Sequence, residues 1–192
     1  EVRPHFICSV PRVFEKVYAG VLAKAEAGSP IKKKIFRWAV GVGKEVSRLK
    51  QAGKPVPPLL ASKYRIASKL VFSKMHAALG GRLRFAVSGG APLSREIAEF
   101  FHAAGILILE GYGLTETCPV LTNNREDKFK FGSVGRPLPG VEIRIASDGE
   151  ILGRGGNIAK GYFKKPEATA EVFLADGWFA TGDIGKLDED GF

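Results

Sequence analysis

The chain has 192 residues, 45% of them hydrophobic, which is enough for a packed core and excludes a disordered tail. Its formal charge of +9 is unevenly placed, because residues 1–80 hold sixteen Lys and Arg against four Asp and Glu while the remainder is slightly acidic. Cys8 and Cys118 lack the spacing of a zinc site or disulfide framework, and no apolar run approaches the roughly 18 residues of a membrane span. Free thiols in a reducing, cytoplasmic compartment are the simplest expectation.

Residues 1–80 are predicted to be helical and basic. Apolar residues at four-residue spacing after Pro11 predict a helix over 9–27, and a second helix is predicted over 31–50. That second helix has its Lys and Arg residues largely off a predicted apolar stripe of Ile31, Ile35, Trp38, Ala39, Val42, Val46 and Leu49. Prolines make 51–60 a loop, and a third helix over 62–80 ends at a glycine pair.

Residues 81–131 change to a strand, helix, strand rhythm. The segment "RLRFAVSGG" predicts a strand over 82–90, and a helix over 92–105 with Ser94 as its N-cap is followed by the strand "ILIL". This order is typical of a parallel sheet in an α/β fold. Ligands of such sheets bind beyond the carboxyl ends of the strands, which here carry "SGGAP" and "EGYGLTE".

Residues 132–192 are predicted to form a small β-rich subdomain. Val141, Ile143 and Ile145 alternate before the turn dipeptide Asp148-Gly149, which predicts a hairpin. A short helix is expected over 164–173, and "GWFATGDIGKLDEDGF" predicts a strand, a loop and a second strand.

The loops at the strand ends have the composition of a nucleotide site. The glycines of "SGGAP" let a flat ring approach the backbone, and Tyr112 offers an aromatic face for stacking. Thr115 can bond a phosphate oxygen, and Glu116 can share Mg²⁺ with phosphates. Asp183, after a glycine, can accept both hydroxyls of a ribose.

Five motifs follow one another in a particular order: "SGGAPL", "GYGLTET", "GSVGRPLPGVEIRI", "GEILGRGGNIAKGYFKKPEAT" and "GWFATGDIG". In this order they resemble the adenylate-forming acyl-CoA synthetase superfamily, with the likeness covering residues 83–192 nearly without gaps. The segments "VPRVFEKV", "KIFRWAVGVGKEV" and "LGGRLRFAVSGGAPLSREIAEFF" are similar to the long-chain fatty-acid CoA ligase branch. The resemblance implies part of the large N-terminal domain of such an enzyme.

The resemblance also implies a reaction and roles for individual residues. A carboxylate reacts with ATP to give an acyl-adenylate and pyrophosphate, and coenzyme A then gives the thioester, with Mg²⁺ as cofactor. Gly90, Ala91, Glu110, Gly111 and Tyr112 are expected to line the adenine pocket, beside Pro92. Thr115 is expected to contact phosphate, Glu116 to bind Mg²⁺ and Asp183 to hold the ribose. Gly89 and Gly113 are expected to border the acyl tunnel.

Three parts of the family's machinery have no match in the chain. These are a phosphate loop ending in Pro-Lys-Gly, an Arg with a hinge residue, and a catalytic Lys in a mobile C-terminal domain. The expectation is therefore a central fragment that is inactive alone. Alternative interpretations are another adenylating ligase, for aryl or amino acids, and a non-catalytic nucleotide- or lipid-binding module.

Each motif also has an ordinary structural interpretation. Glu116 can be a carboxylate favoured by a helix N-terminus, and Asp183 an ordinary turn residue. The three histidines are expected to be structural, and Cys118 is expected to be a packed, inert thiol. The basic helix is either a solvated face or a contact with anionic lipid. No nucleic-acid-binding signature accompanies the charge, so nucleic acid is not expected as a partner.

Overall fold

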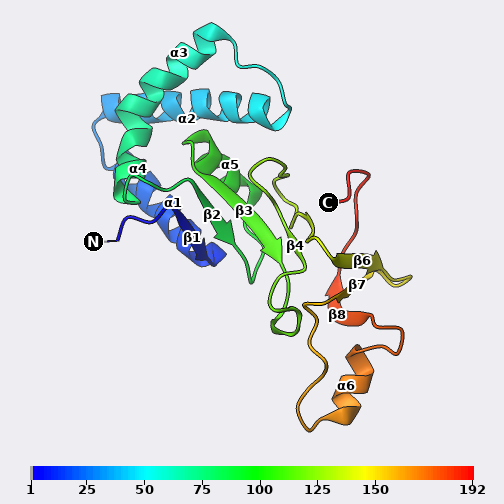
Figure 1. Cartoon of the computed structure of the whole chain (residues 1–192). Helices are drawn as coiled ribbons and strands as arrows, with labels where there is room; N and C mark the ends of the chain where they lie inside the picture. Colours follow the sequence, from blue (N-terminus) through cyan, green and yellow to red (C-terminus); the bar gives the residue numbers. More distant parts are fainter. Residues whose placement is uncertain (1) are drawn as a thin grey trace. The chain divides into compact units, whose positions relative to one another are not determined.

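The computed structural model describes residues 2–192, which form two compact units (Figure 1). Unit 1 contains the chain up to Glu110 together with Glu126–Gly132, and unit 2 contains Gly111–Arg125 and Ser133–Phe192. The sequence predicted three segments, 1–80, 81–131 and 132–192. They were defined by residue composition, whereas the two units are defined by contacts, and the three segments stay a prediction.

Unit 1 is built on three parallel strands, which confirms the α/β class. These strands are β1 (Phe6–Ser9), β2 (Phe85–Ser88) and β3 (Leu107–Tyr112). In the register of β2 and β3, Phe85 pairs with Leu107 and Ser88 with Glu110. The crossover between them is α5 (Arg95–Ala103), so the predicted strand, helix, strand unit is present. Ser94 occupies the N-cap position, but its side chain makes no capping hydrogen bond.

Helices make up most of residues 10–80. They are α1 (Pro11–Glu26), α2 (Pro30–Gln51), α3 (Pro58–Ala67), the π-helical segment η1 (Ser68–Phe72) and α4 (Ser73–Ala78). Each of the first three starts at a proline, which suits a first helical turn because that position has no intrahelical N–H bond to lose. Helix α2 packs on α5 at Gly43, where a Cβ atom would lie 2.5 Å from the backbone oxygen of Ala103. Only glycine permits this close approach.

Aromatic side chains hold the core of unit 1 together. Phe100 and Phe101, on α5, pack edge to face with centroids 5.6 Å apart. Phe14 of α1 lies 6.2 Å from the Phe101 ring, and Tyr18 lies 4.8 Å from the Phe100 ring. These contacts fix α1 against α5, since buried aromatic pairs contribute about 0.5–1.5 kcal/mol beyond their buried area.

Three features of the first 80 residues differ from the sequence prediction. Residues 58–60 were predicted to belong to a loop but begin α3, because a proline suits the first turn of a helix. Residues 6–9 form the strand β1, although the first 80 residues were predicted to be helical, because they pair with the distant strand β2. The apolar stripe of α2 is buried at Ala39, Val42 and Val46, whereas its N-terminal part is open: Ile31 is 71% exposed and Trp38 is 38% exposed. The regular spacing of apolar residues therefore extends beyond the part of α2 that is buried against other elements.

Unit 2 consists of short antiparallel strands. The last two residues of β3 pair with β4 (Thr122–Asn123), which pairs with β5 (Arg136–Pro137). A separate sheet contains β6 (Val141–Ile145), β7 (Glu150–Gly155) and β8 (Phe179–Ile184), with α6 (Pro166–Val172) before β8. The predicted hairpin and short helix are present. Residues 185–192 contain no strand, so the prediction of a second strand there is wrong, and Asp183 lies within β8 rather than in a loop.

Candidate functional site

The glycine-rich loop after β2 belongs to unit 1, where Ser88 at the end of β2 pairs with Glu110 of β3. It contains Gly89, Gly90, Ala91 and Pro92, and the Gly89 amide donates to the carbonyl of Ser9 at 3.1 Å. Gly90 has φ +80, and no atom lies within 4 Å of where a Cβ would stand. Gly90 is exposed, and the space next to its α-carbon is empty, so a flat ring could approach the backbone at this position.

Ser88, the last residue of β2, has a polar atom with no partner. Its side chain is 1% exposed, and among residues 2–192 its Oγ makes no hydrogen bond. Buried hydroxyls are normally satisfied, and an unpaired one costs roughly 1–3 kcal/mol. An orphaned hydroxyl next to an open glycine loop fits a site that receives a polar ligand such as a nucleotide.

Glu110, which pairs with Ser88 across the strands, anchors the loop after β2. It is 6% exposed, and the Leu93 amide donates to its Oε1 at 3.1 Å. Burial raises the pKa of this carboxyl, while hydrogen bonds from the Leu93 and Gly132 amides act in the opposite direction. The structure thus brings together the predicted residues Gly89, Gly90, Ala91, Pro92 and Glu110. The carboxyl of Glu110 therefore accepts a hydrogen bond from the backbone of the loop and does not point into open space.

In unit 2 the predicted adenine and ribose residues are joined directly. The Tyr112 hydroxyl donates to Oδ2 of Asp183 at 2.7 Å, although 71 residues separate them. Burial and the neighbouring carboxylate both raise the pKa of the Tyr112 hydroxyl, so it remains a donor at neutral pH. The Asp183 amide in turn donates to Thr181 Oγ1 at 3.2 Å, which fixes the backbone that carries the carboxylate.

Two glycines of the second motif are required by close packing. A Cβ on Gly111 would lie 2.7 Å from Asn123 Oδ1, and one on Gly113 would lie 1.8 Å from the backbone oxygen of Pro119. The chain therefore folds back tightly after β3. This turn, rather than a flexible linker, delivers the short 3₁₀ helix η2 (Thr115–Thr117).

The turn after β3 presents the predicted phosphate and magnesium residues. Thr115 is exposed, and Glu116 accepts a hydrogen bond from the Tyr162 hydroxyl at 2.7 Å on Oε1. Within residues 2–192 no group of three or more His, Cys, Asp or Glu could hold a metal by itself. A single oriented carboxylate fits Mg²⁺, which commonly takes one or two carboxylates and completes its shell with water and substrate phosphates.

Sequence reasoning missed two residues that support this turn. Asn157 Nδ2 donates to the carbonyls of Thr117 at 2.7 Å and Val120 at 2.9 Å, and Tyr162 holds Glu116 as described. Both belong to a motif recognised in the sequence, but nothing local indicates a partner about forty residues away. Cys118 was predicted to be packed, and that is wrong: it is an exposed free thiol with φ +51.

Comparison with known proteins gives consistent matches. The family model described as AMP-binding enzyme matches residues 1–163. Long-chain-fatty-acid–CoA ligase FadD15 of Mycobacterium bovis is 46% identical over 190 residues, which is 99% of this chain and 31% of that protein. Long chain acyl-CoA synthetase 3 of Arabidopsis thaliana is 37% identical over 205 residues, with 99% and 30% covered.

Solved structures are also similar to this chain. An ATP-bound RpMatB-BxBclM chimera is 35% identical with a TM-score of 0.56, covering 66% of this chain and 28% of its own. The anthranilate CoA ligase AuaEII in complex with anthranoyl-AMP is 29% identical with a TM-score of 0.55, covering 58% of this chain and 24% of its own. The chain thus spans less than a third of the length of these proteins.

Proposed function

This chain belongs to the AMP-binding enzyme family, and on that basis we propose that the whole protein is an ATP-dependent ligase joining long-chain fatty acids to coenzyme A. The observation that carries the proposal is 46% identity to FadD15 over 99% of the chain. In the first step a fatty-acid carboxylate oxygen bonds to the α-phosphorus of ATP and pyrophosphate leaves. In the second step the thiol of coenzyme A attacks the acyl carbon, and AMP leaves.

The chain's own residues supply binding and orientation. By the family resemblance, the open backbone of the loop of Gly89, Gly90, Ala91 and Pro92 in unit 1 would contact adenine, and Tyr112 in unit 2 would offer its ring for stacking. Asp183 would accept the ribose hydroxyls through the oxygen that Tyr112 does not occupy. Phosphoryl displacement of this kind depends mostly on positioning and electrostatic stabilisation.

The turn after β3 would serve the phosphates. Thr115 would donate to a phosphate oxygen, and Glu116 would hold Mg²⁺ through its second oxygen while Tyr162 keeps the carboxylate in place. When bound, the metal ion would neutralise charge on the phosphates. Gly113 would border the acyl chain.

Pyrophosphate release by the full-length protein tests this function. With palmitate, ATP and coenzyme A, release should depend on all the residues above, and Glu116→Gln should lower kcat by about a hundredfold. Glu171→Gln, on the exposed face of α6, is the matched control and should leave the rate unchanged. If palmitate gives no pyrophosphate while amino acids or aryl acids do, the protein is another adenylating ligase. If no acid does, it is a non-catalytic binding module.

We also propose that the protein works in the cytoplasm and makes peripheral contact with anionic membrane through α2. The observation behind this is that Ile31 and Trp38 are exposed beside Lys32, Lys33 and Lys34. Apolar side chains flanked by cations favour the headgroup region, where each Lys near the surface contributes about 1 kcal/mol. No helix among residues 2–192 is long and apolar enough to cross a membrane.

Vesicle flotation tests the membrane contact. Changing Lys32, Lys33 and Lys34 together to Glu should abolish flotation with anionic vesicles and leave pyrophosphate release in detergent unchanged. Equal flotation of the parent and the charge-reversed protein would exclude α2 as the contact.

A further inference from the structure

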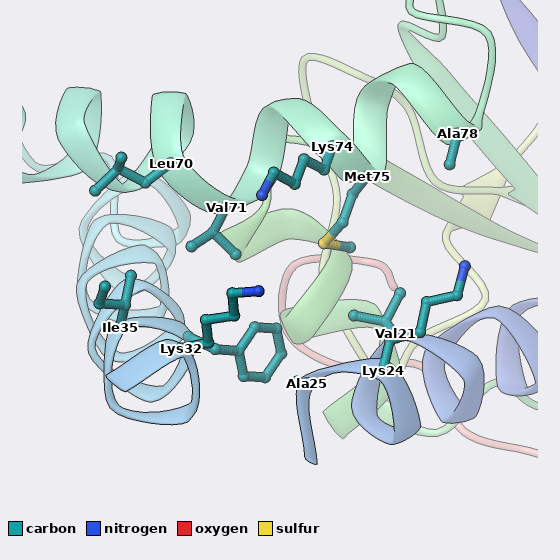
Figure 2. Close-up of a pocket in the computed structure, with 11 residues that line it drawn as sticks. Val21, Lys24, Ala25, Lys32, Ile35, Leu70, Val71, Lys74, Met75 and Ala78 are labelled. Atoms are coloured by element: carbon teal, nitrogen blue, oxygen red, sulfur yellow. The ribbon is translucent and has the colours of Figure 1, made fainter. Parts of the chain in front are cut away.

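A groove opens between α1, α2, η1 and α4, and it is lined by none of the predicted nucleotide-site residues (Figure 2). Its volume of about 570 Å³ lies inside the range of roughly 300–1,000 Å³ that is typical of small-molecule sites. Phe36, Val71 and Met75 are among the apolar side chains that line it. Such a space can take one alkyl chain out of water.

Among residues 2–192, lysine is the only charged residue type that lines the groove. Lys24 comes from α1, Lys32 from α2 and Lys74 from α4, and each is exposed. Figure 2 shows Lys32 and Lys74 extending into the same space from their two helices. Among residues 2–192, none of the three lysines has an ion-pair partner.

The acidic residue at the end of α1 does not neutralise these lysines. Glu26 pairs instead with Lys33 and Arg37, each at 3.2 Å, and those bonds lower the pKa of its carboxyl. Three ammonium groups therefore surround an apolar space without a counter-ion from the described chain. This combination of charge and apolarity is complementary to an anionic amphiphile.

The wall of the groove is built from an uncommon element. Leu70 and Val71 belong to the π-helical segment η1, which lies between α3 and α4. Segments of this kind occur often at functional sites, because the wider turn moves side chains out of the regular helical register. Leu70 is 49% exposed and Ile35 is 37% exposed, so apolar surface remains open at the groove instead of closing on itself.

We propose that this groove binds a single-chain amphiphile with a phosphate monoester head. The alkyl chain would lie against Phe36, Val71 and Met75, and the head would lie among the ammonium groups of the three lysines. A phosphate monoester carries about −1.5 to −2 charges at neutral pH and offers three acceptor oxygens, so it matches three lysines better than a single carboxylate does. The site does not depend on the ligase activity, since a phosphate ester has no carboxylate to adenylate.

Calorimetric titration of the full-length protein with dodecyl phosphate below its micelle concentration tests the proposal. Changing Lys24, Lys32 and Lys74 together to Ala should weaken binding at least tenfold, because each Lys near an anionic lipid head is worth about 1 kcal/mol, or about fivefold. The matched control changes Lys16, Lys63 and Lys69 to Ala. These exposed lysines lie on α1, α3 and η1, outside both the groove and the proposed membrane contact, and their loss should alter affinity by less than about threefold.

A second variant tests the apolar half of the site. Ala78→Trp, at the exposed end of α4, should fill the groove without changing charge, and it should also weaken dodecyl phosphate at least tenfold. Thermal melting establishes that each variant is folded. Dodecylphosphocholine, which has the same chain and no net charge, and inorganic phosphate, which has no chain, should both bind more than tenfold more weakly.

Three results would overturn the proposal. Equal loss in both lysine triples would mean diffuse attraction to a basic surface, and normal binding by Ala78→Trp would mean that the alkyl chain lies elsewhere. Absence of dodecyl phosphate binding to the folded parent protein would mean that another part of the protein covers the groove. Because no vesicle and no fatty acid is used, none of these outcomes can be confused with failure of the proposed membrane contact or ligase activity.

Discussion

His102 should make the stability of unit 1 dependent on pH. Its Nδ1 lies 2.7 Å from the Ser47 hydroxyl, and its ring meets the edges of Phe129 and Phe131. Burial, with a smaller contribution from the charge of Lys50, lowers the pKa of this imidazole from 6.5 to about 4. The folded protein therefore resists protonation at pH values where the unfolded chain accepts a proton.

The magnitude follows from the two pKa values. Because the pKa is lower in the folded state, stability is complete above about pH 6.5 and falls as the pH approaches 4. Between about pH 7.5 and about pH 5 this one group should remove roughly 2 kcal/mol from the free energy of unfolding. Below the folded pKa the loss approaches roughly 3 kcal/mol.

Urea unfolding of the parent protein and of His102→Asn at those two pH values measures the effect. Asparagine keeps a polar atom near the position of Nδ1, toward Ser47, but does not titrate. The variant is expected to start less stable, because the ring is lost from between two phenylalanines, so the informative quantity is the change with pH. Between the two pH values the parent should lose roughly 2 kcal/mol more than the variant. Equal losses would refute the reasoning from burial.

Two further predictions concern the turn after β3. Gly113→Ala should cost about 3 kcal/mol or more in the free energy of unfolding, because its Cβ would stand 1.8 Å from the Pro119 backbone oxygen, and an unchanged urea midpoint would contradict that geometry. Tyr162→Phe removes the donor to Glu116 and keeps the ring, so the Mg²⁺ concentration for half-maximal pyrophosphate release should rise about tenfold with kcat nearly retained. A fall in kcat at saturating Mg²⁺ would instead mean that Tyr162 touches the substrate.

Helices and the parallel strand pair could be predicted because their signals are local. Periodic apolar residues marked α1 and α2, with Pro11 marking the first turn of α1, and short apolar runs followed by glycines marked β2 and β3. Strand β1 could not be predicted this way. Its four residues become a strand only by pairing with β2, which lies more than seventy residues away in the sequence.

In the candidate site, too, features within a short motif could be predicted, whereas contacts between distant segments could not. The roles proposed for Glu116 and Asp183 rest on motif composition, but the tyrosine that donates to each carboxylate could not be predicted from it. Tyr112 had been assigned only a ring for stacking, and Tyr162 had no role, since their hydroxyl bonds span 71 and 46 residues. Such pairs depend on how the strands of unit 2 fold back, which no short segment specifies.

The two tyrosine–carboxylate pairs have a common consequence for the proposed reaction. In each, one carboxylate oxygen accepts from a phenol at 2.7 Å, which fixes the direction of the group and leaves its second oxygen for a ligand. A carboxylate already oriented loses less side-chain entropy when it binds. Because Tyr112 would both stack on the adenine and hold Asp183, correct placement of the ring would place the ribose as well. Tyr112→Phe should therefore weaken ATP binding although the stacking face is unchanged, which separates the hydroxyl's positioning of Asp183 from the ring's contact with adenine.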